Sequence, residues 1–271
     1  MAALLELERS LHGAGERYHS LPLQGGMTAL LTQRGARVLG LFPSADADNL
    51  FWTNDAIADA AKLRAFVANG GWNLGGERIW IAPEIQYNVR NRRDFFGTLA
   101  VPYAMDPGEY ELSVTDDGAR WEQTITLTAH NLASGEKRLH LVRSIQPAAN
   151  PLAQAEMSDL VYGGYAQMVT LTELDNAPIL SATWNLLQMN AGGTLLIPYY
   201  DAISSDLYFG SAPDEVLVGA GGTLRIPITG KRQFKVGYRA LCMTGRMGYW
   251  RRLAGGTETL LVRVFFNNPS N

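Results

Sequence analysis

An arginine and a tryptophan two residues apart are the side chains of this chain best suited to hold a polar ring. Arg78 and Trp80 lie in 77–82, a short strand-like run that follows two glycine pairs. Side chains alternate along a strand, so Arg78 and Trp80 share one face while Glu77 takes the other. A guanidinium beside an indole offers hydrogen-bond donors and an apolar face together. The sequence therefore predicts a binding surface here, which Trp72 from the glycine-rich stretch extends.

Acid–base chemistry at this surface would need a carboxylate and a proton donor. Glu84 follows Pro83 at the end of the run and is the carboxylate we expect to act as a base, ahead of Glu77 and Glu173. His130, at the end of a predicted strand, is the histidine placed best for catalysis. No histidine or cysteine spacing typical of a metal site occurs, and no motif calls for a cofactor.

A second candidate region is 244–252, which combines glycines, aromatic residues and arginines. Read as a loop, it predicts that Arg246, Tyr249 and Trp250 form a stacking platform with hydrogen-bond donors. Both regions also have a plain structural interpretation. The first would be an edge strand with an Arg–Glu pair and a packed tryptophan, and the second a packed loop with solvated arginines.

Composition narrows the class of protein. Hydrophobic residues make up 46% of the 271 residues and charged residues 18%, which is typical of a folded chain. The net charge of −3 and the absence of a long basic run argue against a nucleic-acid partner. A single cysteine excludes an internal disulfide, no apolar run is long enough to span a membrane, and the start lacks a secretory signal. We therefore expect a cytoplasmic protein without a membrane partner.

The pattern along the chain predicts an all-β fold of large antiparallel sheets with one short surface helix. Apolar positions spaced by three and four residues between Ile57 and Val67 predict that helix, and the leucines of 4–11 predict one or two turns at most. Candidate strands are expected at 27–32, 36–42, 49–53, 77–82, 110–115, 120–129, 138–146, 167–174, 179–188, 194–198, 206–209, 223–228, 234–238 and 257–266. We interpret 146–157 as a loop and 1–271 as a single domain.

Three motifs in the first hundred residues carry a family resemblance. The runs 35–40 (GARVLG), 49–52 (NLFW) and 75–80 (GGERIW) resemble, in order and spacing, the galactose mutarotase-like superfamily, which includes the aldose 1-epimerases. The chain is most similar to uncharacterised bacterial members. This resemblance implies a β-supersandwich with a sugar site on a concave sheet face. It also implies that Arg78 contacts the sugar, whereas Thr183 and Trp184 stand where those enzymes carry a histidine.

These observations predict a carbohydrate-binding protein whose partner is a sugar or oligosaccharide. An aldose 1-epimerase type of isomerase activity is one interpretation. A non-catalytic carbohydrate-binding or assembly module is the second, and a polysaccharide lyase or hydrolase on the same fold is the third. A proton donor within hydrogen-bond reach of a carboxylate in the pocket would favour the enzyme. The sequence leaves the identity of the sugar and the oligomeric state open.

Overall fold

Strands dominate the computed structural model, which describes residues 3–151, 160–200, 202–212, 222–253 and 255–267. Within these residues the chain forms fifteen strands in four antiparallel sheets, and its helices are short. The all-β sandwich expected from the sequence is confirmed. No helix of the described part is long and apolar enough to cross a membrane.

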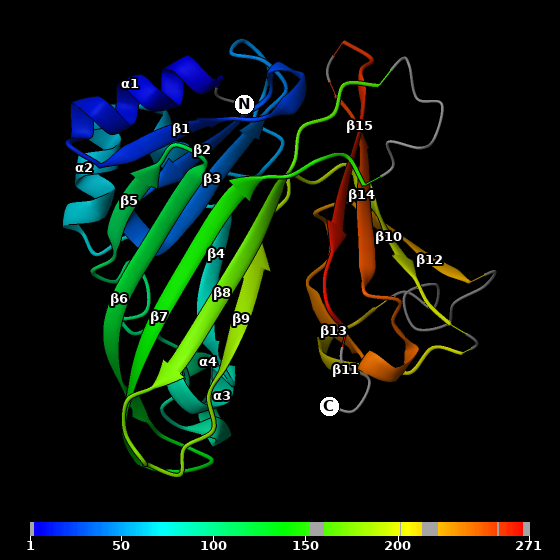
Figure 1. The fold of residues 1–271 in the computed structure, drawn as a ribbon. Helices are drawn as coiled ribbons and strands as arrows, with labels where there is room; N and C mark the ends of the chain where they lie inside the picture. Colours follow the sequence, from blue (N-terminus) through cyan, green and yellow to red (C-terminus); the bar gives the residue numbers. More distant parts are fainter. Residues whose placement is uncertain (1–2, 152–159, 201, 213–221, 254, 268–271) are drawn as a thin grey trace. The chain divides into compact units, whose positions relative to one another are not determined.

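The chain divides into two compact units, Met1–Met189 and Asn190–Asn271. Each unit has its own sheets and its own apolar core, so each is described by itself (Figure 1). The single domain expected over 1–271 stays a prediction.

The first sheet of unit 1 has five strands in the order β1-β2-β3-β4-β9. Their bounds are β1 Tyr18–Pro22, β2 Thr28–Thr32, β3 Arg37–Phe42, β4 Glu77–Ala82 and β9 Ala182–Leu187. β4 has the predicted bounds but is an inner strand, paired along its length with β9, and is not at the sheet edge. Residues 49–53 make isolated bridges and no strand, which corrects the prediction there, and β1 was missed.

The second sheet of unit 1 is a four-stranded antiparallel meander. It consists of β5 Glu111–Thr115, β6 Gly118–Ala129, β7 Gly135–Pro147 and β8 Tyr165–Glu173. Buried and exposed residues alternate along β6 and β7, so one face is buried and the other meets solvent. The buried face packs on the first sheet, where Trp121 Nε1 donates to Thr32 O at 2.8 Å. Of the predicted loop 146–157, residues 152–157 lie outside the described residues.

A polar network also joins the two sheets of unit 1. Arg143 Nη2 on β7 donates to Glu77 Oε2 at 2.9 Å, and Tyr165 Oη on β8 donates to the same oxygen at 2.8 Å. Gln167 Nε2 donates to Asn185 Oδ1 on β9 at 2.7 Å. Glu77 and Arg143 are both buried, so the pairing satisfies charges that would otherwise be costly in the interior. It also fixes the face of β4 that turns inward.

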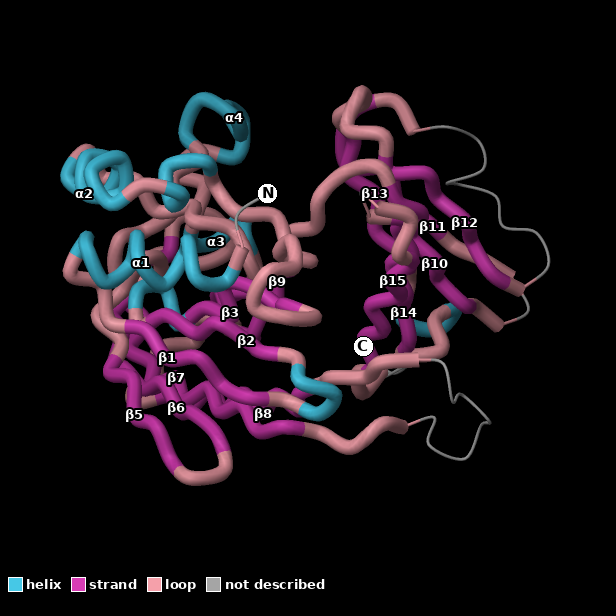
Figure 2. The backbone as a smooth tube through the Cα atoms, turned by 90° about the horizontal axis from the view of Figure 1, so that it is seen from above, coloured by secondary structure: helices cyan, strands magenta, loops and turns pink. Residues whose placement is uncertain are grey.

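Helices cover the opposite face of the first sheet. The chief ones are α1 (Leu4–Ala14) and α2 (Ala60–Ala68), which is preceded by a 3₁₀ helix at Asp55–Ala58. The side chains of Asn54 and Asp59 cap these two helical segments by accepting from backbone N–H groups. Figure 2 shows α1 and α2 on one side of β1–β3 and the second sheet on the other. The leucines of 4–11 thus form a complete helix of three turns, longer than expected.

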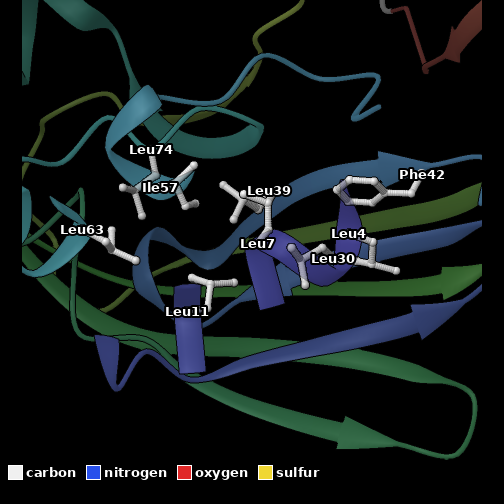
Figure 3. Close-up of a cluster of buried hydrophobic side chains, with 9 residues drawn as sticks. All are labelled: Leu4, Leu7, Leu11, Leu30, Leu39, Phe42, Ile57, Leu63 and Leu74. Atoms are coloured by element: carbon white, nitrogen blue, oxygen red, sulfur yellow. The ribbon is translucent and has the colours of Figure 1, made fainter. Parts of the chain in front are cut away.

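The apolar contacts beneath these helices form one buried cluster, drawn in Figure 3. Its members come from α1, β2, β3 and the segment around α2, and they are Leu4, Leu7, Leu11, Leu30, Leu39, Phe42, Ile57, Leu63 and Leu74. Each such side chain contributes about 1.5–3 kcal/mol when it is removed from water. Two further short helices, α3 (Glu84–Tyr87) and α4 (Phe95–Thr98), follow β4, so the single helix expected from the sequence is too few.

Unit 2 contains a four-stranded sheet in the order β12-β10-β14-β15 and a two-stranded ribbon of β11 and β13. The bounds are β10 Gly193–Pro198, β11 Ser205–Gly210, β12 Thr223–Ile228, β13 Phe234–Tyr238, β14 Arg246–Arg252 and β15 Glu258–Val264. Its core is built on Ile197, Leu224, Ile226 and Met243. β14 occupies most of 244–252, so the prediction of a loop there is wrong. This changes how Arg246, Tyr249 and Trp250 are arranged.

Candidate functional site

The direction of the β4 side chains decides where a site can form in unit 1. Glu77 points inward to Arg143, so Arg78 and Trp80 point to the face turned away from the second sheet. Arg78 pairs in register with Leu186 on β9, and Trp80 pairs with Trp184. The predicted alternation is therefore confirmed, and it places two tryptophans side by side next to an arginine.

A third segment contacts β4 where the pairing of β4 with β3 ends. The two strands meet at one register pair, Val38 with Glu77. Beyond it, Ile81 N donates to Met105 Sδ at 3.5 Å, from the loop before β5. Gly76 sits at the junction with φ +70°, and a Cβ there would meet Val38 O at 2.4 Å. Only glycine fits this close approach, which explains one of the glycine pairs of the sequence.

We call the group of side chains next to this short pairing of β3 with β4 the Arg78 cluster. Its members are Arg37, Trp72, Arg78, Trp80, Asp106 and Gln188. Asp106 is its anchor, because Arg37 Nη2 donates to both carboxylate oxygens at 2.8 and 2.6 Å and Trp80 Nε1 donates to Oδ2 at 2.9 Å. Arg37 also donates to Gly75 O and Trp72 O, each at 2.9 Å, and so fixes the glycine-rich loop.

Arg78 is held against two indole rings. Its Cζ lies 5.4 Å from the ring centroid of Trp72 and 4.6 Å from that of Trp80. The two rings are themselves 5.3 Å apart, so the three groups form a nearly equilateral triangle and both rings lie to the same side of the guanidinium. Arg78 Nη1 donates to Gln188 Oε1, and Arg78 Nε lies 3.8 Å from Asp106 Oδ2.

Burial lowers the pKa of Arg78 to about 10, with the positive charge of Arg37 acting in the same direction and Asp106 opposing it. The side chain therefore remains protonated at neutral pH. Arg78 and Trp80 are buried, at 6% and 5% exposure, and form the floor of the cluster. Trp72, Gln188 and the neighbouring Trp184 are half-buried and form its accessible rim. Such an arrangement can stack a ring and donate hydrogen bonds to it.

Glu84 and His130 lie away from the Arg78 cluster, beyond the far end of β4. Ala82 is four residue steps of strand, about 13 Å, from Arg78, and Glu84 then begins α3. His130 follows β6, and its backbone N donates to Gln86 O of α3 at 2.9 Å. The structure thus brings the two predicted acid–base residues to one end of unit 1, and it does not bring them to Arg78.

Arg246, Tyr249 and Trp250 belong to unit 2 and lie on β14. Alternation along the strand turns Tyr249 and Trp250 to opposite faces, so they do not form one platform. Tyr249 is buried, donates to Asn190 O and accepts from Gly193 N at 3.0 Å. Burial raises the pKa of its phenol. Trp250 is 38% exposed and, like Arg246, remains accessible.

Sequence reasoning missed a His–Glu pair on the solvent face of the second sheet. His140 Nε2 and Glu122 Oε1 are 2.7 Å apart across β7 and β6, and this hydrogen bond lowers the pKa of Glu122. The long hairpin joined at Ser134-Gly135 carried the signal, because its register places Glu122 diagonally to His140. Both side chains are open to solvent, and they line no described pocket.

Arg37, Asp106 and Gln188 were also absent from the sequence-based site. Asp106 is followed by Pro107 and Gly108, a sequence typical of a turn. Nothing local therefore indicates that Asp106 contacts two arginines. A polar hollow of about 280 Å³ exists elsewhere in unit 1, lined by Arg17, Arg34 and Tyr103 among others, and contains no member of the Arg78 cluster.

The described residues contain no group of three or more His, Cys, Asp or Glu side chains arranged to hold a metal ion. Comparisons of the chain with protein-family models, with curated proteins and with solved structures found no match. The function is therefore inferred from the geometry of the Arg78 cluster.

Proposed function

We propose that the chain binds a carbohydrate at the Arg78 cluster and does not transform it. The observation that carries this proposal is the guanidinium of Arg78 packed against Trp72 and Trp80, with Trp72, Trp184 and Gln188 accessible around it. The resemblance of the first hundred residues to the galactose mutarotase-like superfamily favours the same class of ligand. Because that resemblance concerns the fold, the function has to be inferred from the site.

The chemistry of the cluster suits a pyranose ring. One face of such a ring presents C–H groups, which pack well against an indole, and its edge presents hydroxyl groups, which accept from a guanidinium. Trp72 and Trp184 offer the aromatic surface at the rim. Arg78 and Gln188 offer the polar groups between them, and the Arg37–Asp106 pair holds the floor in place.

Binding is favoured over epimerisation by what surrounds the guanidinium. Ring opening of a sugar needs a free base and a proton donor close to the anomeric centre. Asp106 is the carboxylate of the cluster, and both of its oxygens already accept from Arg37. All four histidines are described, and they lie on α1, β1, β7 and the segment after β6, none of which builds the cluster. We therefore place the chain with the non-catalytic binders.

The proposal is tested by titrating simple aldoses and their disaccharides into the protein while recording tryptophan fluorescence and heat. Saturable binding is expected, and Trp72→Ala should weaken it at least about tenfold, since one aromatic stacking surface is lost. Trp250→Ala is the matched control, because it removes an exposed tryptophan from unit 2. Loss of binding in the control instead would move the site to β14.

A polarimetric assay of anomer interconversion distinguishes the binder from the enzyme. Freshly dissolved aldoses should mutarotate at the uncatalysed rate in the presence of the protein. Acceleration that disappears in Glu84→Gln would overturn the non-catalytic proposal and support an aldose 1-epimerase type of activity. Trp72→Ala should leave the rate unchanged, because no chemistry is assigned to the stacking surface.

A further inference from the structure

One buried carboxylate serves two buried guanidinium groups in the Arg78 cluster. Arg37 and Arg78 are 0% and 6% exposed, and Asp106 is 2% exposed. Arg37 Nη2 lies 2.6 Å from Asp106 Oδ2, whereas Arg78 Nε lies 3.8 Å from the same oxygen. Asp106 is thus neutralised mainly by Arg37. Among the described residues, the positive charge of Arg78 is therefore only weakly compensated by a negative one.

The donors of Arg78 are poorly satisfied as well. Nη1 donates to the neutral amide oxygen of Gln188, and the buried Nε has no hydrogen-bond partner in the described structure. A buried charge without a counter-ion is costly, and proteins retain one chiefly where something else compensates it. The lowered pKa of Arg78 reflects the same desolvation and the same repulsion from Arg37.

The contacts of the guanidinium divide into aromatic and polar ones. Trp72 and Trp80 lie to one side of it, as the triangle of 5.3, 5.4 and 4.6 Å shows. Besides the ion pair with Asp106, Arg78 donates to Gln188, whose half-buried amide oxygen is an acceptor that a ligand oxygen can replace. The planar fork of an arginine can donate two parallel hydrogen bonds to the oxygens of a carboxylate, as it can to those of a phosphate.

We propose that the sugar held at the Arg78 cluster carries a carboxylate, as a uronic acid does, and that this carboxylate pairs with Arg78. The inference rests on the proposed function and specifies its ligand. It accounts for the second arginine, which a neutral sugar would leave to share the single carboxylate of Asp106 with Arg37. It also explains why aromatic side chains accompany the charge, since a uronic acid has both an anionic edge and an apolar ring face.

Paired sugars that differ only at C6 provide the test. D-galactose is compared with D-galacturonate, and D-glucose with D-glucuronate, by calorimetric titration of the full chain at neutral pH and low ionic strength. At least one uronate should bind about tenfold or more tightly than its neutral partner. Added salt should reduce this preference, because it screens the charge pair. The salt titration needs no variant and so avoids any effect of mutation on folding.

Two substitutions test whether Arg78 causes the preference for a uronate over its neutral partner. Arg78→Gln should abolish this preference. Arg78→Lys, which keeps the charge without the planar fork, should lose most of it. Arg120→Gln, on the solvent face of β6, is the matched control and should leave the ratio unchanged. Circular dichroism of each variant checks that it is folded.

The outcomes separate the inference from the proposed function. Equal affinity for both members of each pair would overturn the inference while leaving carbohydrate binding intact. If no sugar of either pair binds, the proposed function fails together with it. If D-galactose 6-phosphate binds as tightly as D-galacturonate, the site recognises anions in general and the preference for a carboxylate is wrong.

Discussion

Arg37 and Asp106 are joined through Nη2 and both carboxylate oxygens, at 2.8 and 2.6 Å, although 69 residues separate them in the chain. Both side chains are essentially excluded from solvent. Trp80 Nε1 donates to the same carboxylate at 2.9 Å, so one residue of a turn holds the first residue of β3 and the middle of β4 together. The carboxylate of Asp106 thus links β3 to β4 beside their one register pair.

Asp106→Asn should be strongly destabilising. The substitution removes the only carboxylate of the Arg78 cluster among the described residues and leaves two buried guanidinium groups close together. Breaking a buried ion pair in this way costs about 3–5 kcal/mol. The free energy of unfolding in urea measures it. Asp206→Asn, which affects an exposed Asp–Arg pair in unit 2, is the control and should cost less than about 1 kcal/mol. An equal loss of unfolding free energy in the two variants would show that burial does not determine the cost of breaking the ion pair.

Arg37→Ala and Arg78→Ala should differ in their effect on stability. Arg37 donates to Asp106 and to two backbone carbonyl groups, so its loss should cost about 3 kcal/mol or more. Arg78 donates to one neutral amide, and its removal relieves a desolvated charge, so a loss below about 1.5 kcal/mol is expected. Sugar binding should nevertheless be weakened most in Arg78→Ala. If this variant unfolds as readily as Arg37→Ala, Arg78 has a structural role and the proposed site is wrong.

The local pattern predicted β4 well, because its six residues include two isoleucines and a tryptophan and are bounded by glycine and proline. It therefore gave the correct faces for Glu77, Arg78 and Trp80. It did not give their partners. Arg143 reaches Glu77, and Asp106 reaches Arg78, across 66 and 28 positions of the chain, and only the packing of the sheets sets such pairings.

The error at 244–252 has a physical cause too. Gly245 and Gly248 suggested a loop, yet β14 lies between β10 and β15 and is paired on both sides. A glycine is tolerated inside this strand because Leu196 and Leu260 occupy the space around Gly248. Once the segment is a strand, alternation separates Tyr249 from Trp250. Treating glycines as loop signals thus produced a platform that the backbone does not allow.

Gly76→Ala and Gly70→Ala provide a matched pair for the junction of β3 and β4. Both glycines have positive φ, +70° and +77°, so each alanine incurs a left-handed backbone strain of about 1 kcal/mol. A Cβ at Gly70 has nothing within 4 Å, whereas one at Gly76 would meet Val38 O at 2.4 Å and Leu39 Cα at 2.7 Å. Urea unfolding should therefore show a small loss for Gly70→Ala and a loss of several kcal/mol for Gly76→Ala. Similar losses would mean that β3 and β4 can move apart freely.

Tyr110 should make the protein sensitive to alkali. Burial, assisted by the charge of Asp106, raises the pKa of its phenol well above the usual value of 10.0. The folded state therefore keeps this proton at a pH where the unfolded chain has lost it. The resulting stability is complete below about pH 10 and falls by about 1.4 kcal/mol for each further pH unit until the folded group ionises.

Tyr110→Phe isolates this contribution. At pH 8 the variant should be about 1 kcal/mol less stable than the parent, since the hydrogen bond from the Tyr110 hydroxyl to Met105 O is lost. By pH 11 the difference in unfolding free energy between parent and variant should have become smaller or changed sign. The reason is that only the parent loses stability through the ionisation of this phenol. Urea unfolding of both proteins at pH 8, 10 and 11 measures the two curves. Parallel curves would show that the phenol beside Asp106 titrates alike in the folded and unfolded states, so that burial does not raise its pKa.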